Sequence, residues 1–371
     1  MNGNVTGQSL VDGSRLIIEA AVRAGGDVFI GYPITPANLL YLYSAQRFPT
    51  VLPAPDEITT LQWMSGYAAA GKLPVTATSF PGLALMIESI GMAYMMELPM
   101  VIILAQRLGP ATGTATCGAQ GDINVINGIN SGGYPIPTLC ISDLDDCWKL
   151  SAEAVKLAFK LRSPVILLSS KEMVMTLRNF DLSKLPEIKP LDKKFYSGSE
   201  KYMPYKGDDQ GIPAFLPVGN PQHQVRITAS THDQKGDLQH TSKEALDNTR
   251  RLQHKMEANL KDYTYYHLDE QDGDTIVVSY DLTSAAAIEA VDRLRARGRK
   301  VSLLICQTLF PVPPDYLKIL SRYRKVVVAE ENLTGQYREV LFGRAGREGV
   351  KGVNAIGRMI SPEDIMEGAE E

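Results

Sequence analysis

Short apolar runs alternate with amphipathic segments along two parts of this 371-residue chain. In the first part, runs such as "MVIILAQR" at 100–107 are apolar almost throughout, as expected of strands buried on both faces of a sheet. Segments such as "SRLIIEAAVRAGG" at 14–26 place apolar residues at helical spacing and end in Gly-Gly. Strands are predicted at 27–32, 50–55, 74–79, 100–107, 138–143 and 164–170, and helices at 14–26, 36–48, 56–72, 83–98, 121–133 and 145–163. This alternation is typical of a doubly wound parallel sheet.

A second, smaller alternation begins at Asp274. Its strands are predicted at 275–281, 300–306, 325–332 and 352–357, and its helices at 284–298, 313–323 and 335–345. The pattern predicts another α/β domain, and its sequence shows no close repeat of the first.

The stretch between the two alternations is polar and rich in proline, glycine, lysine and aspartate, with an exposed helix predicted at 241–263. A loop-rich arm of this length is usually functional or an interface element, and disorder is the other interpretation, which the Tyr, Phe and Pro anchors disfavour. We therefore predict an α/β fold with domains at 1–185 and 271–371, joined by an arm at 186–270 that contacts another subunit.

Composition excludes several classes of protein. The net charge of −4 and the lack of a basic run argue against a nucleic-acid surface. The most apolar segment, 83–105, contains Glu88, Glu97 and Pro99, so we expect a helix and a strand rather than a membrane span. The polar first residues predict no signal peptide, and the chain is expected to be cytoplasmic.

The four cysteines show no CxxC spacing and no neighbouring histidines, so we expect no metal or iron–sulfur site within this chain. Cys140 and Cys306 lie in apolar runs and are expected to be buried thiols. GxGxxG, P-loop and GxSxG motifs are absent.

Candidate chemistry gathers after the predicted strands, because parallel sheets bind ligands beyond the carboxyl ends of their strands. Glu57 lies at such an end. Asp56 and Glu57 either only cap and begin the next helix, or Glu57 is a carboxylate that exchanges a proton with a ligand nitrogen. Arg107 ends an apolar strand and is expected to point into the cleft, where it binds a ligand carboxylate or pairs with a neighbouring acid.

Together these segments resemble a known family. "GYPITP" before a helix, then "DEI", "TATSFPG" and "QRLGPATG" leading to "QGD" are similar to the α subunits of 2-oxoacid:ferredoxin oxidoreductases, especially the 2-oxoglutarate type. "HDQKG", "VVVAEENLTGQYREVL" and "VNAIGRMISPEDI" extend the resemblance over nearly the whole chain.

The resemblance implies a thiamine diphosphate-dependent oxidative decarboxylation of a 2-oxoacid with coenzyme A, giving an acyl-CoA, CO2 and reduced ferredoxin. It implies that 1–185 binds the pyrimidine ring of thiamine diphosphate and that 271–371 resembles the C-terminal domain of transketolase. A β subunit is expected to supply the diphosphate and Mg2+ site and a [4Fe-4S] cluster, and a γ domain or subunit is expected elsewhere. The expected assembly is a hetero-oligomer, (αβ)2 or larger.

The resemblance also assigns roles to individual residues. Glu57 matches the glutamate that bonds the pyrimidine nitrogen, Arg107 the arginine that takes the substrate carboxylate, and Thr35 a threonine near the reacting carbonyl. The residues expected to form the wall of the cofactor site are Tyr32, Pro33, Ile34 and Phe80.

Four departures from the family pattern fall on loops expected to face the substrate: Ala37, Phe80, Leu108 and Ala111. 2-Oxoglutarate is the expected substrate, with pyruvate, branched-chain, aryl or oxalate substrates as alternatives. A non-redox thiamine-dependent decarboxylase subunit and a non-catalytic structural subunit are the other functions left open.

Overall fold

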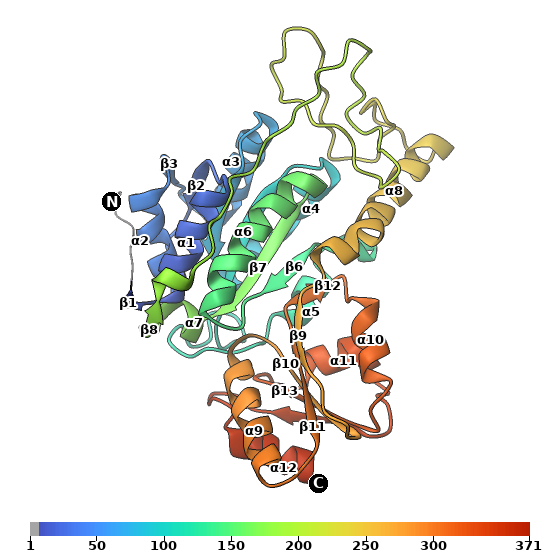
Figure 1. Cartoon of the computed structure of the whole chain (residues 1–371). Helices are drawn as coiled ribbons and strands as arrows, with labels where there is room; N and C mark the ends of the chain where they lie inside the picture. Colours follow the sequence, from blue (N-terminus) through green and yellow to red (C-terminus); the bar gives the residue numbers. More distant parts are fainter. Residues whose placement is uncertain (1–6) are drawn as a thin grey trace.

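The computed structural model describes residues 7–371, which form two sheet-based units and a long arm (Figure 1). Residues 1–6 of the polar amino-terminal stretch lie outside the described part. Near the start of the described residues, β1 (Gln8–Val11) pairs antiparallel with β8 (Arg178–Asp181), which lies just before the arm.

The first unit contains a seven-stranded sheet with the order β12-β6-β7-β5-β4-β2-β3. Its strands are β2 (Val28–Gly31), β3 (Thr50–Pro53), β4 (Pro74–Thr78), β5 (Met100–Gln106), β6 (Thr138–Cys140), β7 (Pro164–Ser170) and β12 (Thr308–Phe310). All neighbouring pairs are parallel except β12 with β6, so the predicted parallel sheet is confirmed with one antiparallel edge. Strands β4, β5 and β7 are buried at every position, as their continuous apolar sequences predict.

Two groups of helices cover this sheet. Helix α1 packs against α2 and α6, and α3 packs against α4. Their bounds are α1 (Gly13–Ala24), α2 (Asn38–Arg47), α3 (Glu57–Ala69), α4 (Phe80–Met95), α5 (Ile123–Asn127), α6 (Leu144–Leu161) and α7 (Lys171–Met175). The helix predicted at 121–133 is wrong in length, because Gly128 ends α5 and a 3-10 turn with Gly132 at φ 83° follows.

The C-terminal unit contains a five-stranded sheet with the order β14-β13-β10-β11-β9. Its strands are β9 (Tyr266–Asp269), β10 (Thr275–Ser279), β11 (Val301–Cys306), β13 (Lys325–Glu330) and β14 (Val350–Asn354). Its helices are α9 (Ser284–Ala296), α10 (Pro314–Leu320), α11 (Gln336–Phe342) and α12 (Pro362–Glu370). The predicted burial of Cys140 and Cys306 is confirmed, since both are 0 % exposed.

The two sheets meet at the carboxyl ends of their parallel strands. Gln106 at the end of β5 donates to Asp281 just after β10, with Nε2 3.0 Å from Oδ2. Gln120 donates from Nε2 to the Tyr280 carbonyl at 2.6 Å and accepts at Oε1 from the Glu331 amide at 2.6 Å. The C-terminal unit therefore docks on the edge of the first sheet where ligands are expected.

The arm lies at the opposite, amino-terminal edge of the first sheet, where it packs against the residues that precede β5 and β7 (Figure 1). Arg162, just before β7, donates from Nη1 to the arm carbonyls of Pro204 at 2.9 Å and Ala214 at 2.8 Å. The bounds predicted for the domains and the arm stay a prediction.

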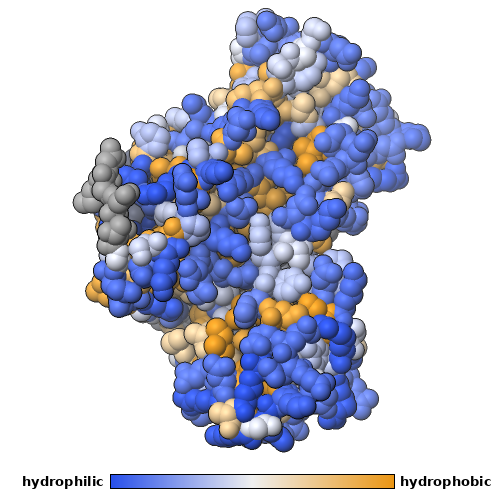
Figure 2. Space-filling view, in the orientation of Figure 1, coloured by the Kyte–Doolittle hydropathy of each residue, from blue (hydrophilic) through white to orange (hydrophobic). Residues whose placement is uncertain are grey.

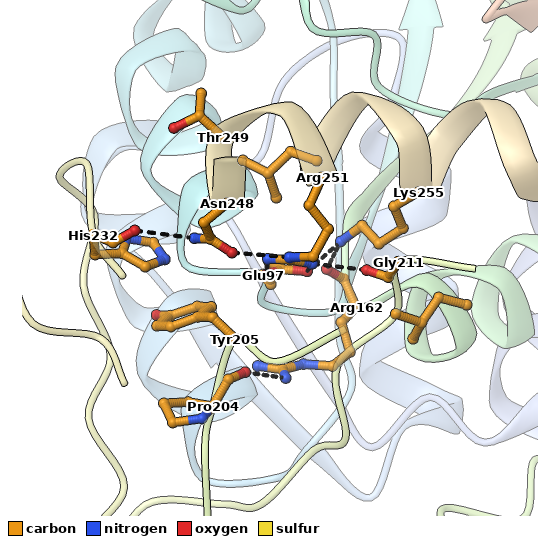
Figure 3. A network of polar contacts seen from close by, with 12 residues as sticks. Glu97, Arg162, Pro204, Tyr205, Gly211, His232, Asn248, Thr249, Arg251 and Lys255 are labelled. Atoms are coloured by element: carbon orange, nitrogen blue, oxygen red, sulfur yellow. Dashed lines mark hydrogen bonds and ion pairs between the residues drawn. The ribbon is translucent and has the colours of Figure 1, made fainter. Parts of the chain in front are cut away.

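Helix α8 (Lys243–Asn259) lies in the arm, and the exposure that its charged sequence predicts is found on one face of the helix only. Arg251 and Lys255 from α8 both bind Glu97, which lies between α4 and β5 (Figure 3). Glu97 is 0 % exposed and Lys255 1 %. The other face of the helix is buried, because the ion pairs and the apolar side chains of Leu252 and Met256 hold it on the body of the protein.

Most of the face in Figure 2 is polar, and apolar side chains gather where the arm meets the body and at the top of the C-terminal unit. Between residues 7 and 371, no helix is both long enough and apolar enough to cross a membrane.

Candidate functional site

Glu57 is the first residue of α3 and lies directly beyond the carboxyl end of β3. Asp56 caps this helix, because its Oδ1 accepts from the Thr59 amide at 2.6 Å. Glu57 takes no part in the cap, and it is only 6 % exposed. The cap therefore accounts for Asp56 and leaves the Glu57 carboxylate available for another purpose.

The start of α4 lies against the Glu57 side chain, and its backbone comes so close to that side chain that only glycine fits at position 82. A Cβ atom at Gly82 would lie 2.2 Å from Thr78 Oγ1 and 2.7 Å from Glu57 Oε1. Within the described residues, no side chain or amide donates a hydrogen bond to the Glu57 carboxylate, although this residue is buried. Phe80, which is half-buried, begins the same helix two residues earlier.

Thr35 and Arg107 are also in contact, through the backbone of Thr35 and the guanidinium of Arg107. Arg107 Nη1 donates to the backbone carbonyl of Thr35 at 2.5 Å. The arginine is only 7 % exposed, and its Nε atom is buried without a partner. A carbonyl oxygen of the "GYPITP" loop thus takes one of the donors of Arg107, and within the described residues the side chain forms no ion pair with an acid. The binding of a ligand carboxylate stays a prediction.

The helix after this loop, α2, begins two residues later than the sequence predicts, and the same contact gives the reason. Pro36 was expected in its first turn, but α2 begins at Asn38 and Pro36 precedes it. The Thr35 carbonyl, which would accept the first helical hydrogen bond, is bound to Arg107.

The wall expected from the same loop is partly open. Tyr32 is 41 % exposed, Pro33 is exposed, and Ile34 packs in part against the core. The structure therefore brings the candidates together as two pairs, Glu57 with the loop of Phe80 and Thr35 with Arg107. Both pairs lie at the carboxyl ends of adjacent strands, in the order β5-β4-β2-β3.

Asp122 is a residue of this edge to which the sequence assigned no role. It is 5 % exposed, and its amide donates to Gln106 Oε1 at 3.2 Å, directly beside Arg107. Burial raises the pKa of Asp122 to about 7, and the positive charge of Arg107 offsets part of that shift. The only signal in the sequence is its place in the "QGD" motif.

Further acids lie behind the site, where the C-terminal unit docks. Burial raises the pKa of Glu331 to about 7 and that of Asp281 well above its usual range. Asp281 is 0 % exposed and bonds Gln106, so it serves the contact between the two units.

The pyrimidine ring of thiamine diphosphate presents nitrogen atoms that need a hydrogen-bonding carboxyl group, and it needs room beside that group. Within the described residues, Glu57 provides a carboxylate that receives no hydrogen bond, and the absence of a Cβ atom at Gly82 allows the start of α4 to lie directly against that carboxylate. These residues fit the ring. Residues 7–371 contain no group of three or more histidine, cysteine or acidic side chains that could hold a metal ion.

Comparison with family models gives two matches. Residues 19–257 match the thiamine diphosphate-binding domain of pyruvate flavodoxin/ferredoxin oxidoreductases, and residues 273–365 match core domain II of pyruvate:ferredoxin oxidoreductase.

Two curated relatives and one solved structure resemble the chain over most of its length. The 2-oxoglutarate synthase subunit KorA of Methanocaldococcus jannaschii is 33 % identical over 344 residues, 89 % of this chain and 90 % of the relative. The ketoisovalerate oxidoreductase subunit VorB of Methanothermobacter thermautotrophicus is 30 % identical over 364 residues, 96 % of each chain. The 2-oxoglutarate:ferredoxin oxidoreductase of Magnetococcus marinus, solved with 2-oxoglutarate, coenzyme A and succinyl-CoA bound, superposes with a TM-score of 0.91 at 28 % identity. The match covers 98 % of this chain and 65 % of that one.

Proposed function

This chain belongs to the pyruvate flavodoxin/ferredoxin oxidoreductase family, and we propose that it is the α subunit of a 2-oxoglutarate:ferredoxin oxidoreductase. The reaction is the oxidative decarboxylation of 2-oxoglutarate with coenzyme A, and ferredoxin receives the electrons. The observation that carries the proposal is the buried Glu57 carboxylate, which receives no hydrogen bond within the described residues and lies against Gly82.

Glu57 bonds the pyrimidine ring of thiamine diphosphate and exchanges a proton with its ring nitrogen. A carboxylate that is 6 % exposed and fixed at the start of a helix keeps one orientation, which favours proton transfer to one atom. When bound, thiamine diphosphate supplies the nucleophilic carbon that attacks the 2-oxo group. The partner chain supplies the diphosphate and Mg2+ site.

Arg107 binds the carboxylate of the 2-oxoacid, and Thr35 lies beside the reacting carbonyl. The hydrogen bond from Arg107 Nη1 to the Thr35 carbonyl fixes the guanidinium plane, so the remaining donors are oriented before the substrate arrives. Tyr32, Pro33 and Phe80 form the wall of the site. The exposed Tyr32 leaves this wall open toward a second chain.

The choice of 2-oxoglutarate follows the relative from Methanocaldococcus and the structure from Magnetococcus, which carry that substrate in their names. 2-Ketoisovalerate is the second candidate, because the VorB relative matches 96 % of the chain and because Phe80 and Leu108 make the loops more apolar. A panel of 2-oxoacids, assayed with coenzyme A and a viologen acceptor, decides between them. A higher kcat/KM for ketoisovalerate than for 2-oxoglutarate would refute the first choice.

Partner chains are part of the proposal. A β subunit with a [4Fe-4S] cluster completes the site, a γ domain or subunit joins it, and the assembly is (αβ)2 or larger in the cytoplasm. Large apolar side chains exposed on α3 and α4 support a docked partner: Ile58 is 48 % exposed, Trp63 40 % and Leu85 51 %. Purification of the complex from its source and identification of its chains test this composition.

Substitution of Glu57 tests the catalytic assignment. In the assembled complex, Glu57→Ala is expected to lower kcat by about two orders of magnitude or more, because the proton transfer loses its partner. Glu88→Ala, on the exposed face of α4, is the matched control and should retain full activity. Turnover by Glu57→Ala within about threefold of the wild type would refute the assignment.

A further inference from the structure

Asp122 occupies a capping position that it does not use. It precedes α5 as the N-cap residue, yet its side chain accepts no hydrogen bond from that helix. Asp12, Asp56 and Asp143 hold the same position before other helices, and each caps its helix with a side-chain oxygen. Asp122 Oδ2 is instead buried without any partner. An aspartate in this position is therefore kept in the interior for a reason other than helix capping.

A buried donor of opposite charge lies beside it. Arg107 Nε also lacks a partner, while Nη1 of the same guanidinium is bound to the Thr35 carbonyl. Gln106 connects the two residues, because it ends β5 directly before Arg107 and its Oε1 accepts from the Asp122 amide at 3.2 Å. The charge of Arg107 acts on Asp122 through space, without a direct ion pair.

The other ionisable groups near Asp122 belong to the elements that pack around it. Asp281 follows β10, Glu330 ends β13 and Glu331 follows it, and Glu172 lies in α7 against Gly118. Helix α11, which packs against α5, carries Arg338 and Glu339. Among these and the other charged groups, Arg107 is the one that acts on the pKa of Asp122 beside the effect of burial. A second anion can therefore remain near Arg107 only if one of the two carboxyl groups becomes neutral.

We propose that Asp122 is a positioning residue for Arg107 and takes up one proton when the carboxylate of a 2-oxoacid binds the guanidinium. This inference rests on the proposed function, in which Arg107 receives the substrate. Without substrate, the ionised Asp122 balances the buried arginine. With substrate, the proton comes from water and converts Asp122 to the neutral acid, so the net charge at this position stays the same.

The pH dependence follows from this exchange. Burial raises the pKa of Asp122 to about 7, so the side chain is already neutral well below that pH and binding needs no proton there. Above pH 7 the acid is ionised before substrate binds, and each binding event takes up a proton. The KM for the 2-oxoacid should therefore rise by up to about tenfold per pH unit above neutrality, with little change in kcat.

The test compares the wild-type complex with Asp122→Asn, which mimics the neutral acid. Between about pH 6 and pH 8.5, the KM of the variant should change by less than about twofold, while that of the wild type rises by up to about thirtyfold, since about 1.5 pH units of this range lie above the pKa of Asp122. Asp122→Ser, which also removes the ionisable group, should flatten the profile in the same way. Asp143→Asn removes a helix-capping carboxylate and should keep the wild-type profile.

Infrared difference spectra give a readout that does not depend on turnover. Titration of the complex from acid to alkaline pH should show protonated carboxyl bands that disappear near neutrality. Asp122→Asn should lose the contribution of one carboxyl group to this signal, whereas the contribution of Glu331, whose pKa burial also raises to about 7, should remain. If the variant has the same KM profile as the wild type, or if its infrared titration is unchanged, the inference is wrong. A wild-type complex that oxidises no 2-oxoacid would refute the proposed function instead, and the infrared titration would still decide whether Asp122 ionises near neutrality.

Discussion

The buried ion network between Glu97 and helix α8 yields the sharpest stability prediction (Figure 3). Glu97 accepts from Lys255 Nζ at 2.6 Å and is bound by both terminal nitrogens of Arg251. The Arg162 guanidinium also acts on it, so one carboxylate faces three cations. Glu97→Gln keeps the shape of the side chain and removes the only negative charge of this cluster.

The magnitude follows from the charges. Burial by itself would raise the pKa of Glu97, but Lys255 and Arg251 overcome that effect and lower it to about 2 from 4.5. A shift of this size corresponds to about 3 kcal/mol of stability. Removing one partner of a buried ion pair typically costs about 3–5 kcal/mol, which agrees. Burial lowers the pKa of Lys255 to about 8; the charges of Arg251 and Arg162 lower it as well, and that of Glu97 raises it. In the variant Lys255 can lose its proton, which limits the loss of stability.

Urea unfolding measures the effect. We expect Glu97→Gln to lose about 3 kcal/mol and to open the arm between residues 186 and 242 to limited proteolysis, because α8 is seated by this network. Glu88→Gln, an exposed position on α4, is the control and should lie within about 0.5 kcal/mol of the wild type. A loss below about 1 kcal/mol for Glu97→Gln, with the arm still protected, would refute the reasoning.

The pH dependence of the same network has a defined sign. The contribution of Glu97 is fully present above its unfolded pKa of 4.5 and is lost as the pH falls toward about 2. Glu97→Gln should remove this part of the acid sensitivity.

Three further predictions concern the site and its partners. Gly82→Ala should lower activity by about tenfold or more, since a Cβ atom would lie 2.2 Å from Thr78 Oγ1 and 2.7 Å from Glu57 Oε1. Gly91→Ala is the control: its Cβ atom would meet only one atom, at 3.6 Å, and the variant should keep full activity. Gln120→Leu should cost about 2–4 kcal/mol in urea unfolding, because it leaves buried backbone groups of the C-terminal unit unpaired, and an unchanged midpoint would contradict its role between the units. The isolated chain should bind thiamine diphosphate weakly in calorimetry, and tight stoichiometric binding would contradict a shared site.

The sequence determined the layered α/β fold and the edge at which the candidate residues meet. The run at Met100–Gln106 is apolar at almost every position because both faces of β5 are covered. Consecutive residues of the sequence are therefore enough to predict that burial. The prolines and glycines of the loops lie at strand ends for local conformational reasons, so Glu57, Thr35, Phe80 and Arg107 could all be placed at one edge. Their assigned roles stay predictions.

Only the tertiary structure decided which polar groups meet. Lys255 in α8 is a surface residue by its sequence, but it is buried against Glu97, 158 positions away. Strand β12, which follows the arm in the sequence, joins the first sheet. Asp122 precedes α5 without capping it, and its carboxyl group is close enough to Arg107 for that charge to act on it. Local periodicity records whether a side chain is covered, because burial repeats with the helix or strand. It cannot record which charged groups lie next to each other, since Coulomb interactions and hydrogen bonds depend on distances that only the folded chain sets.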